Sequence, residues 1–401
     1  MKRLITLFVL VGLFLAQTMS LQAAPQIAAK DKPDAPAKGK LIPDQYIVVL
    51  KEGTDAQAIA DALGIKAKHV YKSAIKGFTA KLNANQLDAL RANALVDFIE
   101  QDQEVMLSAT QYSPPWGLDR IDQRYLPLSG SYTYVNGGAG VTAYIIDTGI
   151  ESSHWDFGGR AYNVYDAFGG NGEDCNGHGT HVAGTVGGAT YGVAKDVQLR
   201  GVRVLDCAGS GSWSGVIAGV DWVRLYGQRP AVANMSLGGG ASAAVDSAVT
   251  NLVNSGVFTA VAAGNNNGNA CNTSPARASG VLTVAASNSS DTRASFSNYG
   301  GCVELYAPGV NVTSAWLYGG TNTISGTSMA SPHVAGVAAQ YKSLYGDYGS
   351  STINSWITGN ATSGVIRSNP SGTPNLLLAT PDVQAPPPPS EPPPCSSCHI
   401  P

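Results

Sequence analysis

Five short and almost uninterrupted apolar runs limit most strongly how this chain can fold. Strands that are apolar on both faces of the pleat are typical of parallel sheets buried between helices. The runs lie at residues 141–146, 199–205, 232–235, 257–263 and 281–285. Longer segments rich in small residues lie between or after them and predict helices at 178–186, 213–225, 243–254 and 327–344. This alternation predicts an α/β domain with a doubly wound, mainly parallel sheet over residues 109–380.

A smaller unit precedes this domain at residues 41–108. Its apolar pattern predicts strands at 45–50, 68–71, 77–82 and 96–105 and helices at 55–63 and 85–90. The order β-α-β-β-α-β is that of the split βαβ arrangement. Because so few residues bury little surface, we expect a small α+β domain of marginal stability.

The N-terminus has the pattern of an export signal. Lys2 and Arg3 precede an apolar stretch at 4–16, and small residues follow, which predicts a signal peptide over residues 1–24. The Pro-, Ala- and Lys-rich residues 25–40 are typical of a linker. We therefore expect a secreted protein, extracellular or periplasmic, in which cysteines can form disulfides.

Charged residues make up 13% of the chain, about half of the usual ~25%, which leaves enough apolar residues for a large core. Lys and Arg number 25 against 28 Asp and Glu, a net charge of −3 that gives no basic field for phosphate groups. After the signal, no apolar run reaches the ~18 residues of a membrane span. We expect neither a nucleic-acid nor a membrane partner, and a monomer.

Three local sequences offer the groups that acyl transfer by a serine requires: a carboxylate, a base and a nucleophile. Asp147 ends the first apolar run, at the carboxyl end of a buried parallel strand, where the sites of α/β proteins form. His178 lies in NGHGTH, whose glycines let substrate come close. Ser328 lies in GTSMASPH, where Pro332 in the first helical turn would place the hydroxyl and its own N–H at a helix N-terminus.

Each sequence alone also has an ordinary interpretation, as a turn, a satisfied polar histidine or an N-cap serine. Their order discriminates among hydrolases, because α/β-hydrolases follow the order Ser, Asp, His. After Ser328 come only His333, on the same predicted helix, and His399, in the C-terminal tail. A lipase or esterase is therefore excluded, and GTSMA also differs from G-x-S-x-G.

Three blocks, AYIIDTG at 143–149, GHGTHVAG at 177–184 and ISGTSMASPHVAG at 324–336, resemble the signatures of the subtilisin family of serine peptidases. The resemblance extends from residue 109 to about 380 and is greatest to the proteinase K branch and its aqualysin-like exported enzymes. Residues 41–107 resemble the family's inhibitor-type propeptide. The resemblance implies a subtilisin-like fold and a secreted serine endopeptidase made as a self-processing zymogen, with its own propeptide as inhibitor.

In this family the serine attacks the peptide carbonyl, the histidine transfers the proton and the aspartate orients the imidazolium, roles that Ser328, His178 and Asp147 would take here. His181 and His333 would then be structural. The choice of the first histidine in HGTH rests on the resemblance alone, because helical spacing does not separate the two.

The resemblance also implies an oxyanion donor and a substrate cleft. Asn265, in a Gly-rich loop after a predicted strand, matches the family's oxyanion residue. Protein or peptide substrates would add as a strand to two edges, and a pocket floor would hold the side chain before the cut. The edges are Gly209, Ser210 and Gly211, and Ser236, Leu237 and Gly238; the floor is Ala263 and Gly264. None of these residues is charged, so we expect a broad preference for apolar or aromatic side chains.

Four cysteines in the large domain allow three pairings, which the sequence alone leaves open. The aqualysin-like pattern implies Cys175 with Cys207 and Cys271 with Cys302. Catalysis needs no cofactor, but calcium is common in the family, and the resemblance implies a structural site. Its carboxylate would come from Glu304 and its carbonyls from Ser279 and Val281, ligands suited to a hard cation.

The Pro-rich tail at 381–401 ends in CSSCH, which matches the haem attachment pattern C-x-x-C-H. A haem also needs a pocket and usually a second axial ligand, and only two residues follow His399, so a local disulfide or redox-labile pair is favoured. A catalytically silent binding protein on the same fold is the other alternative to the peptidase. The presence of Asp147, His178, Asn265 and Ser328 argues against it.

Overall fold

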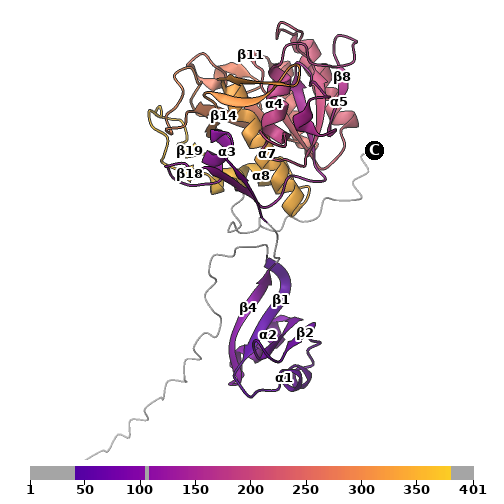
Figure 1. Ribbon diagram of the computed structural model, residues 1–401, viewed down its shortest axis with the longest axis vertical. Coiled ribbons are helices and arrows are strands. Elements are labelled where there is room, and N and C mark those ends of the chain that lie inside the picture. Colours follow the sequence, from indigo (N-terminus) through magenta and orange to yellow (C-terminus); the bar gives the residue numbers. More distant parts are fainter. Residues whose placement is uncertain (1–40, 104–107, 381–401) are drawn as a thin grey trace, which may run out of the picture. The chain divides into compact units, whose positions relative to one another are not determined.

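The computed structural model describes residues 41–103 and 108–380, which divide into two compact units near Asp102 (Figure 1). The predicted signal peptide (1–24), linker (25–40) and tail (381–401, with its CSSCH motif) lie outside the described residues, as do residues 104–107. None of the described helices combines the length and apolar character that a bilayer crossing requires.

The first unit is a four-stranded sheet in the order β2-β3-β1-β4, with two helices. Its elements are β1 Leu41–Leu50, α1 Ala56–Ala62, β2 His69–Tyr71, β3 Gly77–Lys81, α2 Ala84–Ala92 and β4 Val96–Gln103. β1 and β3 pair antiparallel, so that Val48 lies opposite Phe78 in the core. The predicted split βαβ arrangement is confirmed. The end of the last predicted strand, beyond Gln103, falls outside the described residues.

The second unit is built on a nine-stranded sheet in the order β18-β19-β15-β14-β12-β10-β7-β9-β8. The strands in chain order are β7 Thr142–Asp147, β8 Ala161–Asp166, β9 Gln198–Arg203, β10 Ala231–Met235, β12 Phe258–Ala262, β14 Leu282–Ser287, β15 Leu305–Pro308, β18 Thr362–Ser363 and β19 Leu376–Leu377. Among these described strands, the neighbours are parallel except for β18 with β19. The predicted doubly wound, mainly parallel sheet is confirmed.

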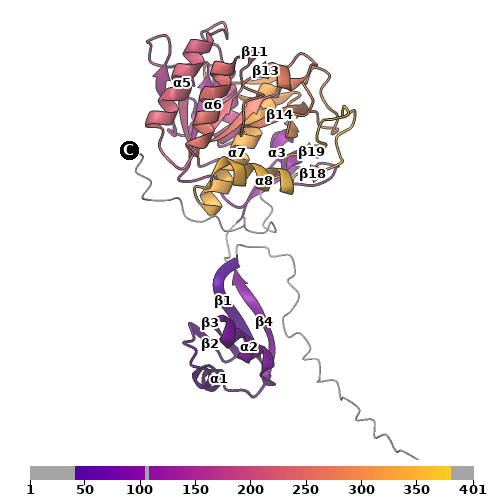
Figure 2. The ribbon, with the colours of Figure 1, turned by 180° about the vertical axis from the view of Figure 1, so that it is seen from behind.

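Helices cover both faces of this sheet, as Figures 1 and 2 show from opposite sides. One layer contains α4 His178–Gly187 and α7 Thr327–Tyr345, and the other contains α5 Trp213–Tyr226 and α6 Ala243–Asn254. Side chains of β7 alternate between the layers: Ala143 and Ile145 join the core below α4 and α7, and Tyr144 and Ile146 the core below α5 and α6. Burial on both faces is why β7 reads as one apolar run.

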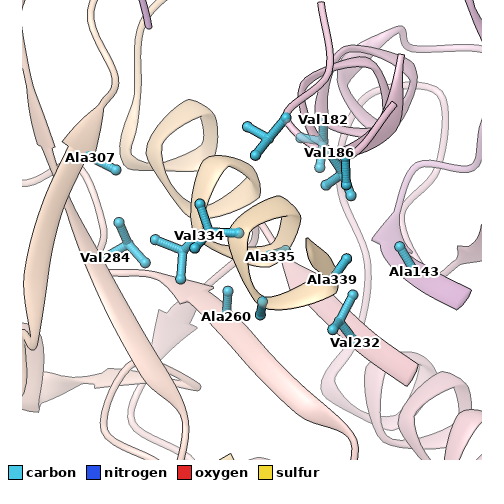
Figure 3. Close-up of a cluster of buried hydrophobic side chains, with 14 of the residues drawn as sticks. Ala143, Val182, Val186, Val232, Ala260, Val284, Ala307, Val334, Ala335 and Ala339 are labelled. Carbon is cyan, nitrogen blue, oxygen red and sulfur yellow. The ribbon is translucent and has the colours of Figure 1, made fainter. Parts of the chain in front are cut away.

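Helix α7 runs through the interior of the unit, with Val334, Ala335 and Ala339 facing the sheet (Figure 3). Its small residues let the helix approach the neighbouring segments closely. At Gly336, even a Cβ atom would lie 2.5 Å from the Cβ of Val193. This packing holds the N-terminus of α7, where Ser328 lies, at a fixed height above the sheet.

The sequence pattern did not predict several of the described helices and strands. They are β8, β15, β18, β19, α3 Trp116–Ile121, α8 Ser350–Asn360, the hairpin of β16 Val312–Trp316 with β17 Gly320–Ile324, and the short pairs of β5 Ala109–Tyr112 with β6 Ser131–Tyr134 and of β11 Gly239–Gly240 with β13 Thr273–Ser274. β8 lies at the edge of the sheet, where Tyr162 is 55% exposed, so its sequence lacks an unbroken apolar run. β15 has only four residues and ends at a proline. Short or half-exposed strands leave little periodic signal.

The structure contains two disulfides, Cys175–Cys207 and Cys271–Cys302, with sequence separations of 32 and 31 residues. This is the pairing that the resemblance implies. The first joins the segment before His178 to the loop after β9.

Removing either disulfide by a double Cys→Ser change is expected to lower the free energy of unfolding by about 3 kcal/mol, because each closes a loop of about 30 residues in the unfolded chain. Activity at low temperature should persist, since neither pair supplies a reacting group. Denaturant unfolding, measured with Ser328→Ala added to prevent autolysis, tests the stability. Peptide mapping that links Cys175 to Cys271 or Cys302 would contradict the pairing.

Candidate active site

Asp147 and His178 are joined by a hydrogen bond of 2.7 Å from Nδ1 of the imidazole to Oδ1 of the carboxylate. Asp147 is the last residue of β7 and is fully buried, whereas His178 is the first residue of α4 and its side chain is 25% exposed. The N–H of Thr148 also donates to Oδ1 at 2.8 Å. The pairing fixes Nδ1 as the bonded nitrogen and leaves Nε2 to face the cleft.

Burial alone would lower the pKa of His178, because it disfavours the imidazolium. The charge of Asp147, its hydrogen bond to Nδ1 and the charge of Asp174 outweigh burial and raise the pKa above its usual value. A raised pKa makes the imidazole a stronger proton acceptor, which suits a general base.

Two other histidines have the opposite character. His181 and His333 are buried, and burial lowers the pKa of each to about 4. Their ring nitrogens contact backbone carbonyls, Val312 O for His181 and Met329 O for His333. Both are neutral at pH 7, and the geometry therefore favours His178 over His181 as the base.

Ser328 is the second residue of α7. Pro332 was expected in the first helical turn, but because α7 already begins at Thr327, the proline lies in the second turn. Pro332 has no N–H to donate to the carbonyl four residues earlier, which is that of Ser328. The hydroxyl of Ser236 donates to this carbonyl instead, at 2.7 Å. One of the predicted substrate-edge residues thus also supports the nucleophile.

The hydroxyl of Ser328 donates to the carbonyl of Ser236 at 3.1 Å. Within the described residues it makes no hydrogen bond with His178. Contacts between a nucleophile and its base are often long without substrate and tighten in the complex. In this structure the hydroxyl of Ser328 is therefore oriented by Ser236.

Asn265 lies after β12, and its amide orientation is fixed by Thr327. The N–H and the hydroxyl of Thr327 both donate to Oδ1 of Asn265, at 2.8 and 2.9 Å, so Nδ2 points the other way. A Cβ atom built on Gly326 would lie 3.6 Å from Nδ2 of Asn265 and 3.6 Å from the backbone N of Ser328. Two hydrogen-bond donors therefore converge beside Gly326, as an oxyanion requires.

Replacing Asn265 by alanine is expected to lower kcat by about 10²–10³-fold with little change in KM, the usual size of the effect when one oxyanion donor is lost. Asn266→Ala is the matched control, because that neighbouring side chain lacks the bonds to Thr327. Steady-state kinetics on a peptide anilide separates the two constants. Equal kcat values in the two variants would remove Asn265 from the site.

The cleft beside these residues has two parts. A cavity of about 620 Å³ lies between the predicted edges Gly209–Gly211 and Ser236–Gly238, next to His178. The second part, of about 370 Å³, contains Ser328 and Asn265 and has no charged residue in its lining. The structure thus brings both predicted edges together around one cleft with the predicted base His178, the predicted nucleophile Ser328 and the predicted oxyanion donor Asn265.

The predicted pocket floor needs a correction at Ala263. Ala262 and Gly264 line the second cavity, whereas Ala263 is buried in a separate cluster with Tyr306. Successive residues of an extended segment point to opposite faces, so the floor residues are two apart. Thr327 was missed, because nothing in its sequence position shows that it holds Asn265.

The predicted calcium ligands lie near the start of β14. Glu304 accepts a hydrogen bond of 2.6 Å from the N–H of Thr283, and burial raises the pKa of its carboxyl to about 7. Among the described residues, no cation pairs with it. The carbonyl of Val281 accepts a bond of 3.4 Å from Asn354, and Ser279 is exposed. The calcium site at Glu304 stays a prediction.

The site combines a buried aspartate that orients a histidine, a serine at a helix N-terminus and two convergent hydrogen-bond donors. On a parallel α/β sheet, this combination defines a serine peptidase. The chain belongs to the subtilase family, whose model matches residues 138–377. Residues 45–108 match the model of peptidase inhibitor I9. The recognised family is therefore confirmed for both units.

Named relatives agree with this assignment. The chain is 50% identical over 391 residues to the extracellular serine proteinase of Thermus sp. (strain Rt41A). This alignment covers 90% of this chain and 94% of the relative. It is 47% identical over 350 residues to proteinase R of Parengyodontium album, covering 85% and 90%. A solved structure of a cold adapted subtilisin-like serine proteinase has a TM-score of 0.66 and 54% identity, covering 67% of this chain and 98% of that one.

Proposed function

We propose that the protein is a secreted endopeptidase of broad specificity in which Ser328 attacks the peptide carbonyl. His178 accepts the hydroxyl proton at Nε2 and returns it to the leaving amine, and Asp147 stabilises the imidazolium. The amide of Asn265 and the N–H of Ser328 bind the oxyanion. The observation that carries the proposal is the bond between buried Asp147 and Nδ1 of His178, which leaves only Nε2 for the nucleophile.

The lining of the second cavity supports a preference for apolar or aromatic side chains before the cut. Glycines at 238–240 and Gly264 leave room in it, and no carboxylate is present to bind Lys or Arg. The name of the Thermus relative, an extracellular serine proteinase, and the predicted signal peptide support secretion.

Incubation of the purified protein with casein, with and without a phosphonylating reagent directed at serine, tests this function. Casein should be cut internally, and the reagent should stop the reaction and label Ser328, as peptide mass spectrometry would show. Intact casein, or a label at another serine, would contradict the proposal. A silent binding protein on this fold would give the first of these outcomes.

We also propose that residues 41–108 act as the chain's own inhibitor after self-cleavage near Ala109. The match to peptidase inhibitor I9 supports this, as does a compact first unit with a core of its own. A chain end added as a strand to the substrate edges would be held as a product is held.

Added in trans to the mature enzyme, residues 41–108 should inhibit peptide hydrolysis at micromolar concentration. A fragment that stops at Gln103 lacks residues 104–108, the chain end that we propose to add to the substrate edges, and should inhibit far less. Progress curves at several inhibitor concentrations provide the measurement. Equal inhibition by both fragments, or none by the longer one, would contradict the mechanism.

A further inference from the structure

Asp174 is a buried carboxylate, 9% exposed, four residues before His178. It accepts five hydrogen bonds. Oδ1 accepts from the hydroxyl of Thr148 and from the N–H groups of Asn176 and Gly177, each at 2.9 Å. Oδ2 accepts from the N–H and the hydroxyl of Thr180, at 2.9 and 2.6 Å. Five hydrogen-bond donors thus converge on this one side chain.

These bonds supply the N-terminal cap that helix α4 otherwise lacks. The residue at the N-cap position is Gly177, which has no side chain to accept a bond. The free N–H groups of the first turn are satisfied from elsewhere: His178 N by Asn176, Gly179 N by Thr148 and Thr180 N by Asp174. A carboxylate at this end of the helix is also favoured by the helix dipole.

The same bonds tie the helix of the base to the strand of its partner. Thr148 directly follows Asp147, donates to Asp174 and accepts from Gly179 in the first turn of α4. Asp174 is thus the shared acceptor between the end of β7 and the start of α4. The distance between Asp147 and His178 depends on how these two ends are held.

We propose that Asp174 is a positioning residue for peptide hydrolysis, which holds the start of α4 against the end of β7 so that His178 meets Asp147. The inference rests on the proposed role of His178 as base. Asp174 touches neither substrate nor the reacting atoms. It acts through the imidazole in two ways, by fixing the position of the ring and by adding a negative charge near it.

The electrostatic effect of Asp174 on the imidazole of His178 can be separated from that of the other charged groups nearby. The charged or titratable side chains that act on His178 are Asp147 at the end of β7, Asp174 in the loop before α4, and His181 on α4 itself. His181 is neutral at pH 7 because burial lowers its pKa to about 4. Loss of the Asp174 charge therefore leaves Asp147 as the anion that favours the imidazolium, and the pKa of His178 should fall.

Asp174→Asn keeps the size of the side chain but removes its charge and turns one acceptor into a donor. We expect kcat to fall about tenfold or more with KM changed less than about twofold, and the acid limb of kcat/KM against pH to move to lower pH. Asp119→Asn is the control. Asp119 is also buried and accepts three bonds from a loop, but lies away from the cleft, so both kcat and the pH profile should stay unchanged.

If Asp174→Asn does not fold, Thr148→Val decides, because it keeps the charge and removes the link between β7 and Asp174. It should lower kcat without moving the acid limb. A folded Asp174→Asn with unchanged kcat and acid limb would overturn the proposal, as would an unchanged kcat in Thr148→Val. Labelling of wild-type Ser328 by the phosphonylating reagent, done in parallel, shows separately whether the proposed function itself holds.

Discussion

Peptide hydrolysis should fall by about 10⁶-fold when Ser328 is replaced by alanine, the size of effect that loss of the nucleophile has in enzymes of this type. The substitution removes one oxygen that hydrogen-bonds only the carbonyl of Ser236 among the described residues, so the fold should persist. Activity is measured on casein and on a peptide anilide, and circular dichroism checks the fold.

The same variant should accumulate as an uncut precursor, because the proposed self-cleavage uses the same serine. N-terminal sequencing of wild type and variant locates the cut, which we expect near Ala109. Asn266→Ala, expressed alongside, should mature normally. Residual hydrolysis within tenfold of wild type, or normal maturation of Ser328→Ala in a protease-free host, would refute the assignment.

Replacing His178 by alanine should lower the rate of peptide hydrolysis nearly as much as Ser328→Ala does, since the two residues act as a unit. His181→Ala should retain turnover on the folded fraction, although it removes a buried ring bonded to the carbonyl of Val312. The kinetic comparison uses enzyme concentrations corrected by active-site titration. Similar kcat values in the two variants would show that the base has been misassigned.

The pH dependence of wild type follows from the same residue. His178 must be neutral to accept the proton, and its pKa is raised, so kcat/KM should fall with decreasing pH from above the ordinary histidine pKa of ~6.5. His181, with a pKa of about 4, would place that limb more than two pH units lower. The pH profile thus distinguishes the two histidines without any mutation.

The sheet could be predicted from sequence because its central strands are buried on both faces. Thr142–Asp147 and Phe258–Ala262 are buried at every position, and short, β-branched apolar runs of this kind are typical of parallel strands covered on both faces. Edge strands such as β8 carry exposed tyrosine and polar residues. β8 is a strand because it pairs with its neighbour β9, and this pairing cannot be seen in the sequence of β8 itself.

The site was predictable as a set of residues but less so as an arrangement. Asp147, His178, Ser328 and Asn265 stand in recognisable blocks. The groups that hold them do not: Thr327 fixes the amide of Asn265, and Asp174 joins two elements, through contacts that only the folded chain creates. For the contact between Ser236 and Ser328 the sequence offered one signal, Pro332. A proline inside a helix has no N–H for the carbonyl four residues earlier, so that carbonyl needs another donor.

The bond from Ser236 to the carbonyl of Ser328 limits how the GTSMASP block can be moved in protein engineering. The two residues are 92 positions apart, on β10's following segment and on α7. Grafted onto a scaffold without a hydroxyl at the place of Ser236, the block would leave the half-buried carbonyl of Ser328 without this donor, at a cost of about 1 kcal/mol. The transferable module is therefore a discontinuous one, made of a strand end and a helix start, and a design that copies only the contiguous motif omits part of its support.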